Sequence, residues 1–115
     1  MSPMPRAFPS LLTALALAAG LGCVPAAAGS ATERKAELVN LVRQDCGSCH
    51  GLTLKGGLGP PLVPEALAGK DRMALAYTIL YGRPGTPMPP WKDFVSEAEA
   101  GWIVEQLLNG FPDGH

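Results

Sequence analysis

The stretch "CGSCH", Cys46–His50, constrains this chain most, because it places two cysteines and a histidine within five residues. The next dozen residues, Gly51–Leu62, show neither helical nor strand periodicity, since glycine and proline interrupt them repeatedly. The 115 residues include 14 glycines and 12 prolines, and only 6% are aromatic, which predicts long loops around a thin core. Domains this small often need a metal, a disulfide or a similar staple. What the cysteines bind therefore decides how the chain can fold.

The first 28 residues differ from the rest of the chain. Arg6 is their only charge, Ser10–Leu21 is an apolar run, and Ala26 and Ala28 supply small residues after it. This order is typical of a secretory signal peptide cleaved after Ala28. A membrane anchor is the alternative, but the apolar run is shorter than the roughly 20 residues of a spanning helix.

Cys23 offers a different processing site, because "GLGC" resembles the sequence at which lipoproteins are cleaved and lipidated. Gly20 stands where a bulky apolar residue is usual, so we expect Cys23 to be discarded with the leader. Lipidation would instead tether the protein to a membrane.

The expected mature chain is a single domain, Gly29–His115, in an oxidising compartment outside the cytoplasm. Removing the leader takes away Arg6 and leaves a formal charge of −2. This charge gives no reason to expect nucleic-acid binding, and it is too small to select a protein partner.

The first expected helix runs from about Ala31 to Cys49. Ser30 and Glu33 fit a capping box at its start, and Gly51 ends it. Apolar residues recur at helical spacing between these ends, which predicts one buried face.

A short helical turn is expected in "PEALAG", followed by a second helix that Asp71 caps and Gly82 ends. Four residues of this helix share one continuous face and are the expected core side: Met73, Ala76, Tyr77 and Leu80.

The segment "GRPGTPMPPW", Gly82–Trp91, holds four prolines and is expected to be extended. Ser96 and Glu99 then form another capping box, which opens a helix to about Leu108. The expected buried side of this helix comprises Ala98, Trp102, Ile103 and Leu107. The pattern predicts an all-α fold, with three to four helices and long loops.

Four kinds of site use a CxxC pair. A structural disulfide is one, and a thioredoxin-like redox pair is another, although the βαβ pattern of that fold is missing. A zinc site needs four ligands, and the mature chain offers only Cys46, Cys49, His50 and the terminal His115 as sulfur or imidazole ligands. The fourth is covalent attachment of a c-type haem, for which CxxCH is the signature.

The spacing favours haem. Residues i and i+3 lie on one face of a helix, so Cys46 and Cys49 can present both sulfurs to the two vinyl groups of one haem edge. His50 follows directly and can place an imidazole against the iron. One haem c is thus the expected cofactor, and a haem in the middle accounts for loops that would otherwise be too long for the domain.

The motifs "CGSCH", "GPPL" and "TPMPPW", with a C-terminal helix carrying Trp102, resemble those of class I monohaem cytochromes c. The resemblance spans nearly the whole mature chain. It implies the cytochrome c fold, with the N- and C-terminal helices crossing near Trp102. The combination is most similar to the small periplasmic cytochromes of nitrite-reductase (nir) gene clusters, the NirC type.

The sixth iron ligand is expected to be Met88. Prolines 87, 89 and 90 leave its backbone few conformations, and the resembled family takes its ligand methionine from such a loop. Met73 is the other methionine of the mature chain and is expected to fill a gap in the core. His115 or an open site are the remaining alternatives.

The resemblance also implies that the backbone carbonyl of Pro60 accepts a hydrogen bond from His50. Arg83 and Trp91 are candidate partners of the haem propionates. Arg83 reads equally as a solvated loop charge, and Trp91 as a side chain packed on the haem edge. The glycine-rich "KGGLGPP" lacks the strand and the Lys-Ser/Thr of a phosphate loop.

An iron whose two axial positions are both taken cannot bind a substrate, so we expect a one-electron carrier and not an enzyme. We also expect the protein to be periplasmic, because of its leader, and to be a monomer. The resemblance implies a redox partner in denitrification: the cytochrome cd nitrite reductase, or an enzyme that matures its d-type haem. An accessory protein whose sixth site opens, or a redox subunit tethered through Cys23, are the alternative functions.

Overall fold

The computed structural model describes residues 3–4, 20–22 and 29–112. Most of the expected signal peptide, with its cleavage site, Cys23 and the terminal His115, lies outside these residues. The described part is all-helical, as predicted, and contains no strand. Its elements are α1 (Ala31–Leu41), the π-helical turn η1 (Val42–Cys46), α2 (Gly47–His50), α3 (Pro64–Leu67), α4 (Arg72–Tyr81) and α5 (Glu97–Leu108).

The first three elements form one helical run from Ala31 to His50, which confirms the first predicted helix. The Ser30 side chain accepts a hydrogen bond from the Glu33 backbone, and Glu33 returns one to Ser30, so the predicted capping box is present. The run is not a uniform α-helix, because the Gly47 N–H donates to the Val42 carbonyl five residues earlier. Such π turns are rare and occur mostly as single turns inside α-helices. The apolar spacing did not predict this one.

The helix α4 begins and ends where the sequence predicted, with Asp71 accepting from the Ala74 N–H at 2.8 Å and Gly82 at its C-cap. The predicted core face is wrong for two of its members, since Met73 is 81% exposed and Tyr77 is 64% exposed. The side that packs into the core comprises Leu75, Ala76, Ile79 and Leu80. Apolar side chains occur all round this helix, so their spacing alone does not single out one face.

The helix α5 opens with the predicted capping box of Ser96 and Glu99 and ends at Leu108. Ala98 is exposed, so its predicted burial is wrong. The buried residues are Ala100, Ile103, Val104 and Leu107.

Before α5, the proline-rich segment Gly82–Trp91 is not extended throughout, as the sequence predicted it to be. A turn forms where the Thr86 N–H donates to the Arg83 carbonyl at 3.0 Å.

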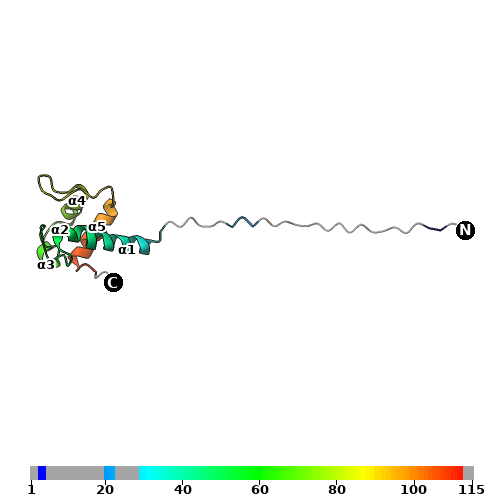
Figure 1. Ribbon diagram of the computed structural model, residues 1–115, viewed down its shortest axis with the longest axis horizontal. Coiled ribbons are helices and arrows are strands. Elements are labelled where there is room, and N and C mark those ends of the chain that lie inside the picture. The colour runs from blue at the N-terminus through cyan, green and yellow to red at the C-terminus, as the bar shows by residue number, and fades with distance from the viewer. Residues whose placement is uncertain (1–2, 5–19, 23–28, 113–115) are drawn as a thin grey trace.

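The helices gather into one domain, in which α5 packs most extensively against α4 (Figure 1). Arg34 joins α1 to α5, since its guanidinium donates to both carboxylate oxygens of Glu99 and to the Phe94 carbonyl. Trp102 packs against the hydrophobic core and lines a groove between α1 and α5, where the resemblance implied a helix crossing. Among the described residues, no helix has the length and apolar character needed to cross a membrane.

Candidate functional site: the Cys46–His50 turn and the Met88 loop

His50 ends α2, and its imidazole is almost fully buried, with 9% of the residue exposed. Its Nδ1 lies 2.7 Å from the carbonyl oxygen of Pro60, the contact that the family resemblance implied. A carbonyl only accepts, so this bond places the proton on Nδ1 and leaves Nε2 as the nitrogen with a lone pair. That is the arrangement in which a histidine binds a metal through Nε2 while a backbone carbonyl fixes the ring.

The segment after His50 wraps back over the CxxCH turn. The Gly56 N–H donates to the His50 carbonyl, and the Gly59 N–H donates to the Cys49 carbonyl, each at 2.8 Å. A Cβ on Gly59 would lie 2.8 Å from two ring atoms of His50. Glycine is therefore needed at this position for the chain to pass beside the imidazole. The repeated glycines suggested only a loop, and sequence reasoning did not single out Gly59.

Arg43 on η1 also holds the segment that follows His50. Its guanidinium donates to the Leu52 carbonyl at 3.5 Å and to the carbonyls of Phe111 and Pro112 at 3.1 and 2.6 Å. It also lies over the Phe111 ring, 5.3 Å from the centroid. The C-terminal segment and the loop after His50 are thus tied to the first helix through one side chain.

Cys46 and Cys49 both carry free thiols, with Cys46 half-buried and Cys49 exposed. Burial, reinforced by the charge of Asp45, raises the pKa of the Cys46 thiol to about 11. The neighbouring Ser48 hydroxyl donates to the Asp45 carbonyl at 2.7 Å and so faces back along the helix. The two cysteines are three residues apart on one helical run, so they are neighbours on the surface of the helix.

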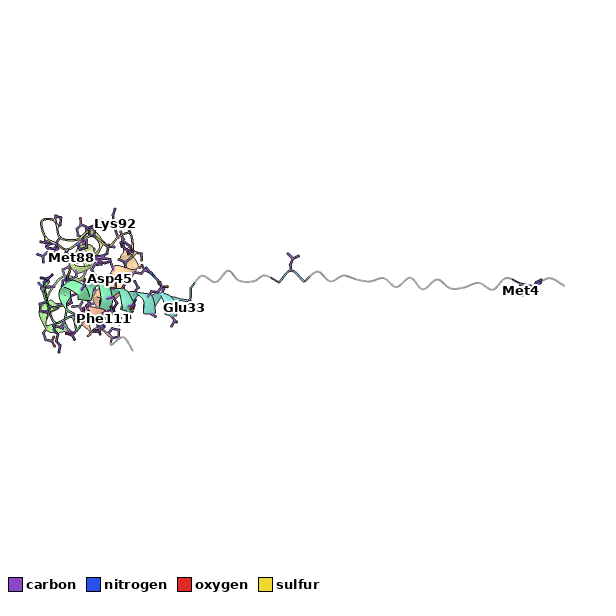
Figure 2. The ribbon with its side chains drawn as sticks, viewed as in Figure 1. Met4, Glu33, Asp45, Met88, Lys92 and Phe111 are labelled. Carbon is purple, nitrogen blue, oxygen red and sulfur yellow. The ribbon has the colours of Figure 1, made fainter. Side chains whose placement is uncertain are left out.

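Met88 is half-buried in the loop that follows α4 (Figure 2). Its carbonyl accepts from the Arg83 N–H at 3.2 Å, and its N–H donates to the Thr86 hydroxyl at 3.4 Å. Arg83 itself is exposed, and Trp91 is half-buried against the core with its ring 5.6 Å from that of Phe94. The two candidate propionate partners thus lie at the two ends of the loop that carries Met88.

A covalently bound haem fits this set of residues. Two thiols stand three residues apart, the imidazole next to them has its Nδ1 engaged, and a thioether is held in a short, proline-rich loop. Among the described residues, no cluster of three or more His, Cys, Asp or Glu side chains could hold a metal ion.

Comparison with known proteins agrees with this chemistry. Residues 20–106 match the family described as cytochrome c oxidase, cbb3-type, subunit III. Cytochrome c55X of Pseudomonas aeruginosa is 61% identical over 77 residues, which cover 67% of this chain and 65% of the relative, slightly under two thirds of its length. The solved structure of a c-type cytochrome NirC is 59% identical, with a TM-score of 0.67 over 68% of this chain and 92% of that one.

A larger protein shares the same domain. Dihydro-heme d1 dehydrogenase of Pseudomonas aeruginosa is 36% identical over 80% of this chain, but over only 18% of its own length. The chain belongs to the matched cytochrome family, which implies a covalently bound haem c. It is a monohaem c-type cytochrome and a close homologue of cytochrome c55X and of NirC.

Proposed function

We propose that this protein is a periplasmic one-electron carrier whose haem is attached to Cys46 and Cys49 and ligated by His50 and Met88. The observation that carries the proposal is the 2.7 Å contact between His50 Nδ1 and the Pro60 carbonyl, which directs Nε2 away from the backbone as a ligand. A haem bound here would supply one-electron redox chemistry, and methionine as a ligand together with histidine would raise its potential.

Each part of the chain has a defined task in this proposal. Pro60 orients the imidazole, the glycine-rich wrap excludes water from it, and the loop after α4 presents Met88. Arg83 and Trp91 are the proposed partners of the propionates, since they lie at the two ends of that loop. A carrier needs nothing further, because its reaction is the transfer of an electron across an exposed cofactor edge.

The spectrum of the reduced protein tests the axial pair. We expect a low-spin haem that does not react with carbon monoxide, since both axial positions are filled. Rapid binding of carbon monoxide by the wild-type protein contradicts the carrier and supports the accessory function with an open sixth site.

The proposed location rests on the leader. We propose export by a signal peptide that is removed after Ala28, leaving Gly29 as the first residue of a periplasmic domain. N-terminal sequencing of the secreted protein tests this cleavage. Incorporation of labelled palmitate into the membrane fraction would instead identify Cys23 as a lipidated N-terminus and the protein as a tethered redox subunit.

The proposed redox partner is the cytochrome cd nitrite reductase of denitrification. The similarity to NirC and to cytochrome c55X supports this assignment, because the resemblance places such cytochromes in nitrite-reductase gene clusters. Mixing the reduced protein with purified nitrite reductase and following its oxidation by stopped flow tests the exchange. Oxidation no faster than that of an unrelated cytochrome c of similar potential rules the enzyme out as a direct partner.

The similarity to dihydro-heme d1 dehydrogenase favours a second candidate, an accessory role in maturing the d-type haem. In that role the protein passes electrons to or from a maturation enzyme and not to nitrite reductase. Deleting the gene separates the two functions. A nitrite reductase that lacks its d-type haem indicates a role in maturation. A reductase that contains its d-type haem but is not reduced in the cell indicates the carrier.

A further inference from the structure

The loop between α4 and α5 closes on the end of α4 at both of its own ends. The Gly82 N–H donates to the Thr78 carbonyl at 2.9 Å, which starts the loop at the helix C-terminus. The Trp91 N–H returns to the carbonyls of Ile79 and Leu80 at 3.0 and 3.1 Å. Carbonyls of the last helical turn lack partners within the helix, so the returning chain satisfies groups that would otherwise need water. The loop carrying Met88 is therefore anchored to one rigid element.

Inside the loop, a second set of bonds holds the Met88 backbone. The Arg83 N–H donates to the Met88 carbonyl at 3.2 Å, while the Arg83 carbonyl accepts from the Thr86 hydroxyl at 2.7 Å. The same hydroxyl accepts from the Met88 N–H at 3.4 Å. Both backbone polar groups of Met88 are thus tied to the first arm of the loop, through Arg83 and Thr86.

At Gly82, the start of the loop passes close to its returning segment, Met88–Pro90. A Cβ at this position would lie 2.6 Å from the Met88 carbonyl oxygen, 2.8 Å from the Pro89 carbonyl carbon and 2.9 Å from the Pro90 nitrogen. All three are backbone atoms, which cannot turn aside as the end of a side chain can. Gly82 also has φ 70° and ψ −169°, a conformation that is essentially limited to glycine.

We propose that Gly82 is a positioning residue for the Met88 thioether, and that the Thr86 hydroxyl supports it by bonding to both Arg83 and Met88. A side chain at Gly82 pushes the Met88–Pro90 backbone away from α4. Prolines allow few backbone conformations, so the loop passes this displacement on to Met88 instead of absorbing it locally. The inference rests on the proposed role of Met88 as an axial ligand.

The experiment uses the full haem-loaded protein with Gly82→Ala, and Gly85→Ala as its control. Gly85 also has a positive φ, 78°, but no atom beyond its chain neighbours lies within 4 Å of a Cβ there, so Gly85→Ala reports the effect of a side chain at a positive φ in the same loop without the clash. We expect reduced Gly82→Ala to bind carbon monoxide and to have a lowered reduction potential. Gly85→Ala is expected to unfold at a lower temperature but to keep both properties. A Gly82→Ala protein that resists carbon monoxide at an unchanged potential overturns the proposal.

If Gly82→Ala yields no haem-loaded protein, a pair of changes at Thr86 decides the matter. Thr86→Val removes the hydroxyl that bridges Arg83 and Met88, and Thr86→Ser keeps it. The proposal expects carbon monoxide binding by the valine variant and wild-type behaviour from the serine variant. Resistance to carbon monoxide in both variants overturns it.

Met88→Ala, measured in parallel, separates this inference from the proposed function. If Met88→Ala opens the sixth site while Gly82→Ala and Thr86→Val do not, only the positioning role is wrong. If Met88→Ala leaves the site closed, Met88 is not the ligand, and the axial assignment and the positioning role both fall.

Discussion

The imidazole of His50 and the carbonyl of Pro60, ten residues apart in sequence, are joined at 2.7 Å between Nδ1 and O. The chain between them turns back through bonds to the carbonyls of Cys49 and His50, so it folds over the helix end that carries both cysteines. The hydrogen bond to the ring comes from a backbone carbonyl, whose chemistry does not depend on side-chain identity. The segment that resembles an unstructured loop in sequence is therefore what orients the histidine.

Gly59→Ala tests how tightly this segment encloses the ring. The new Cβ would lie 2.8 Å from Nδ1 and Cε1 of His50, so the imidazole or the loop must move. Forcing an extra carbon into a packed site costs about 1–3 kcal/mol. We expect a lower yield of haem-loaded protein, a lower free energy of unfolding and a changed low-spin EPR spectrum.

Gly101→Ala is the matched control for that change. Gly101 lies within α5, and no atom outside the helix's own backbone lies within 4 Å of a Cβ there. Alanine is favoured over glycine in a helix by about 0.5–1 kcal/mol, so this variant is expected to have a higher free energy of unfolding than wild type and an unchanged EPR spectrum. Equal behaviour of the two variants would mean that Gly59 does not constrain the ring.

Met88→Ala and Met73→Ala separate a ligand from a surface residue. Loss of the Met88 thioether is expected to lower the reduction potential and to let the reduced protein bind carbon monoxide. Met73 is 81% exposed, so its truncation is expected to change the free energy of unfolding by no more than about 0.5 kcal/mol. Potentiometry and chemical denaturation measure the two effects. A lowered potential in the Met73 variant would reverse the assignment.

The ion pair between Arg34 and Glu99 predicts how stability depends on acidity. Hydrogen bonds from the Arg34 guanidinium and from the Ser96 backbone lower the pKa of Glu99 from 4.5 to about 2. Because the folded pKa lies below the unfolded one, the stabilisation is complete above about pH 4.5 and disappears as the pH falls through about 2. The thermal unfolding midpoint of the wild type should therefore fall across this interval.

Glu99→Gln removes the titrating group, so its unfolding midpoint should start lower at neutral pH and fall less steeply between pH 4.5 and 2. Glu97→Gln is the control, because it removes the same charge from the first turn of the same helix without touching Arg34. Parallel pH profiles for the wild type and Glu99→Gln would show that the ion pair contributes nothing measurable.

Replacing Cys46 and Cys49 together by alanine tests how far the fold depends on its cofactor. The buried apolar residues are few and are mostly leucine, valine and alanine, which makes the protein core small. Without attached haem we expect a chain that unfolds without a cooperative transition, as followed by far-UV circular dichroism during heating. A sharp transition in the double variant would show that the protein core suffices.

The positions of the helices could be read from the sequence because local bonds set them. Ser30 with Glu33 and Ser96 with Glu99 form reciprocal capping boxes three residues apart, and Asp71 caps α4 by accepting one bond from the Ala74 N–H. Such contacts need no other part of the chain. The CxxCH motif is local too, so the sequence alone identified the cytochrome class and predicted the attachment turn.

Tertiary structure decided which surfaces these helices use. The apolar spacing of α4 allowed the face of Met73 and Tyr77, yet packing against α5 buries Leu80 and leaves those two exposed. Burying an apolar side chain lowers the free energy of folding on whichever side of the helix a partner covers. The sequence of a single helix does not specify that side.

Tertiary structure also decided the backbone contacts around the site. The close approaches of Gly59 to His50 and of Gly82 to Met88 depend on two chain segments folding back against each other, which no residue pattern in either segment encodes by itself. The sequence by itself determined which side chains are the candidate ligands and attachment points of a haem. Only the folded chain, through backbone atoms packed closer than a Cβ allows, decided how the imidazole and the methionine loop are held.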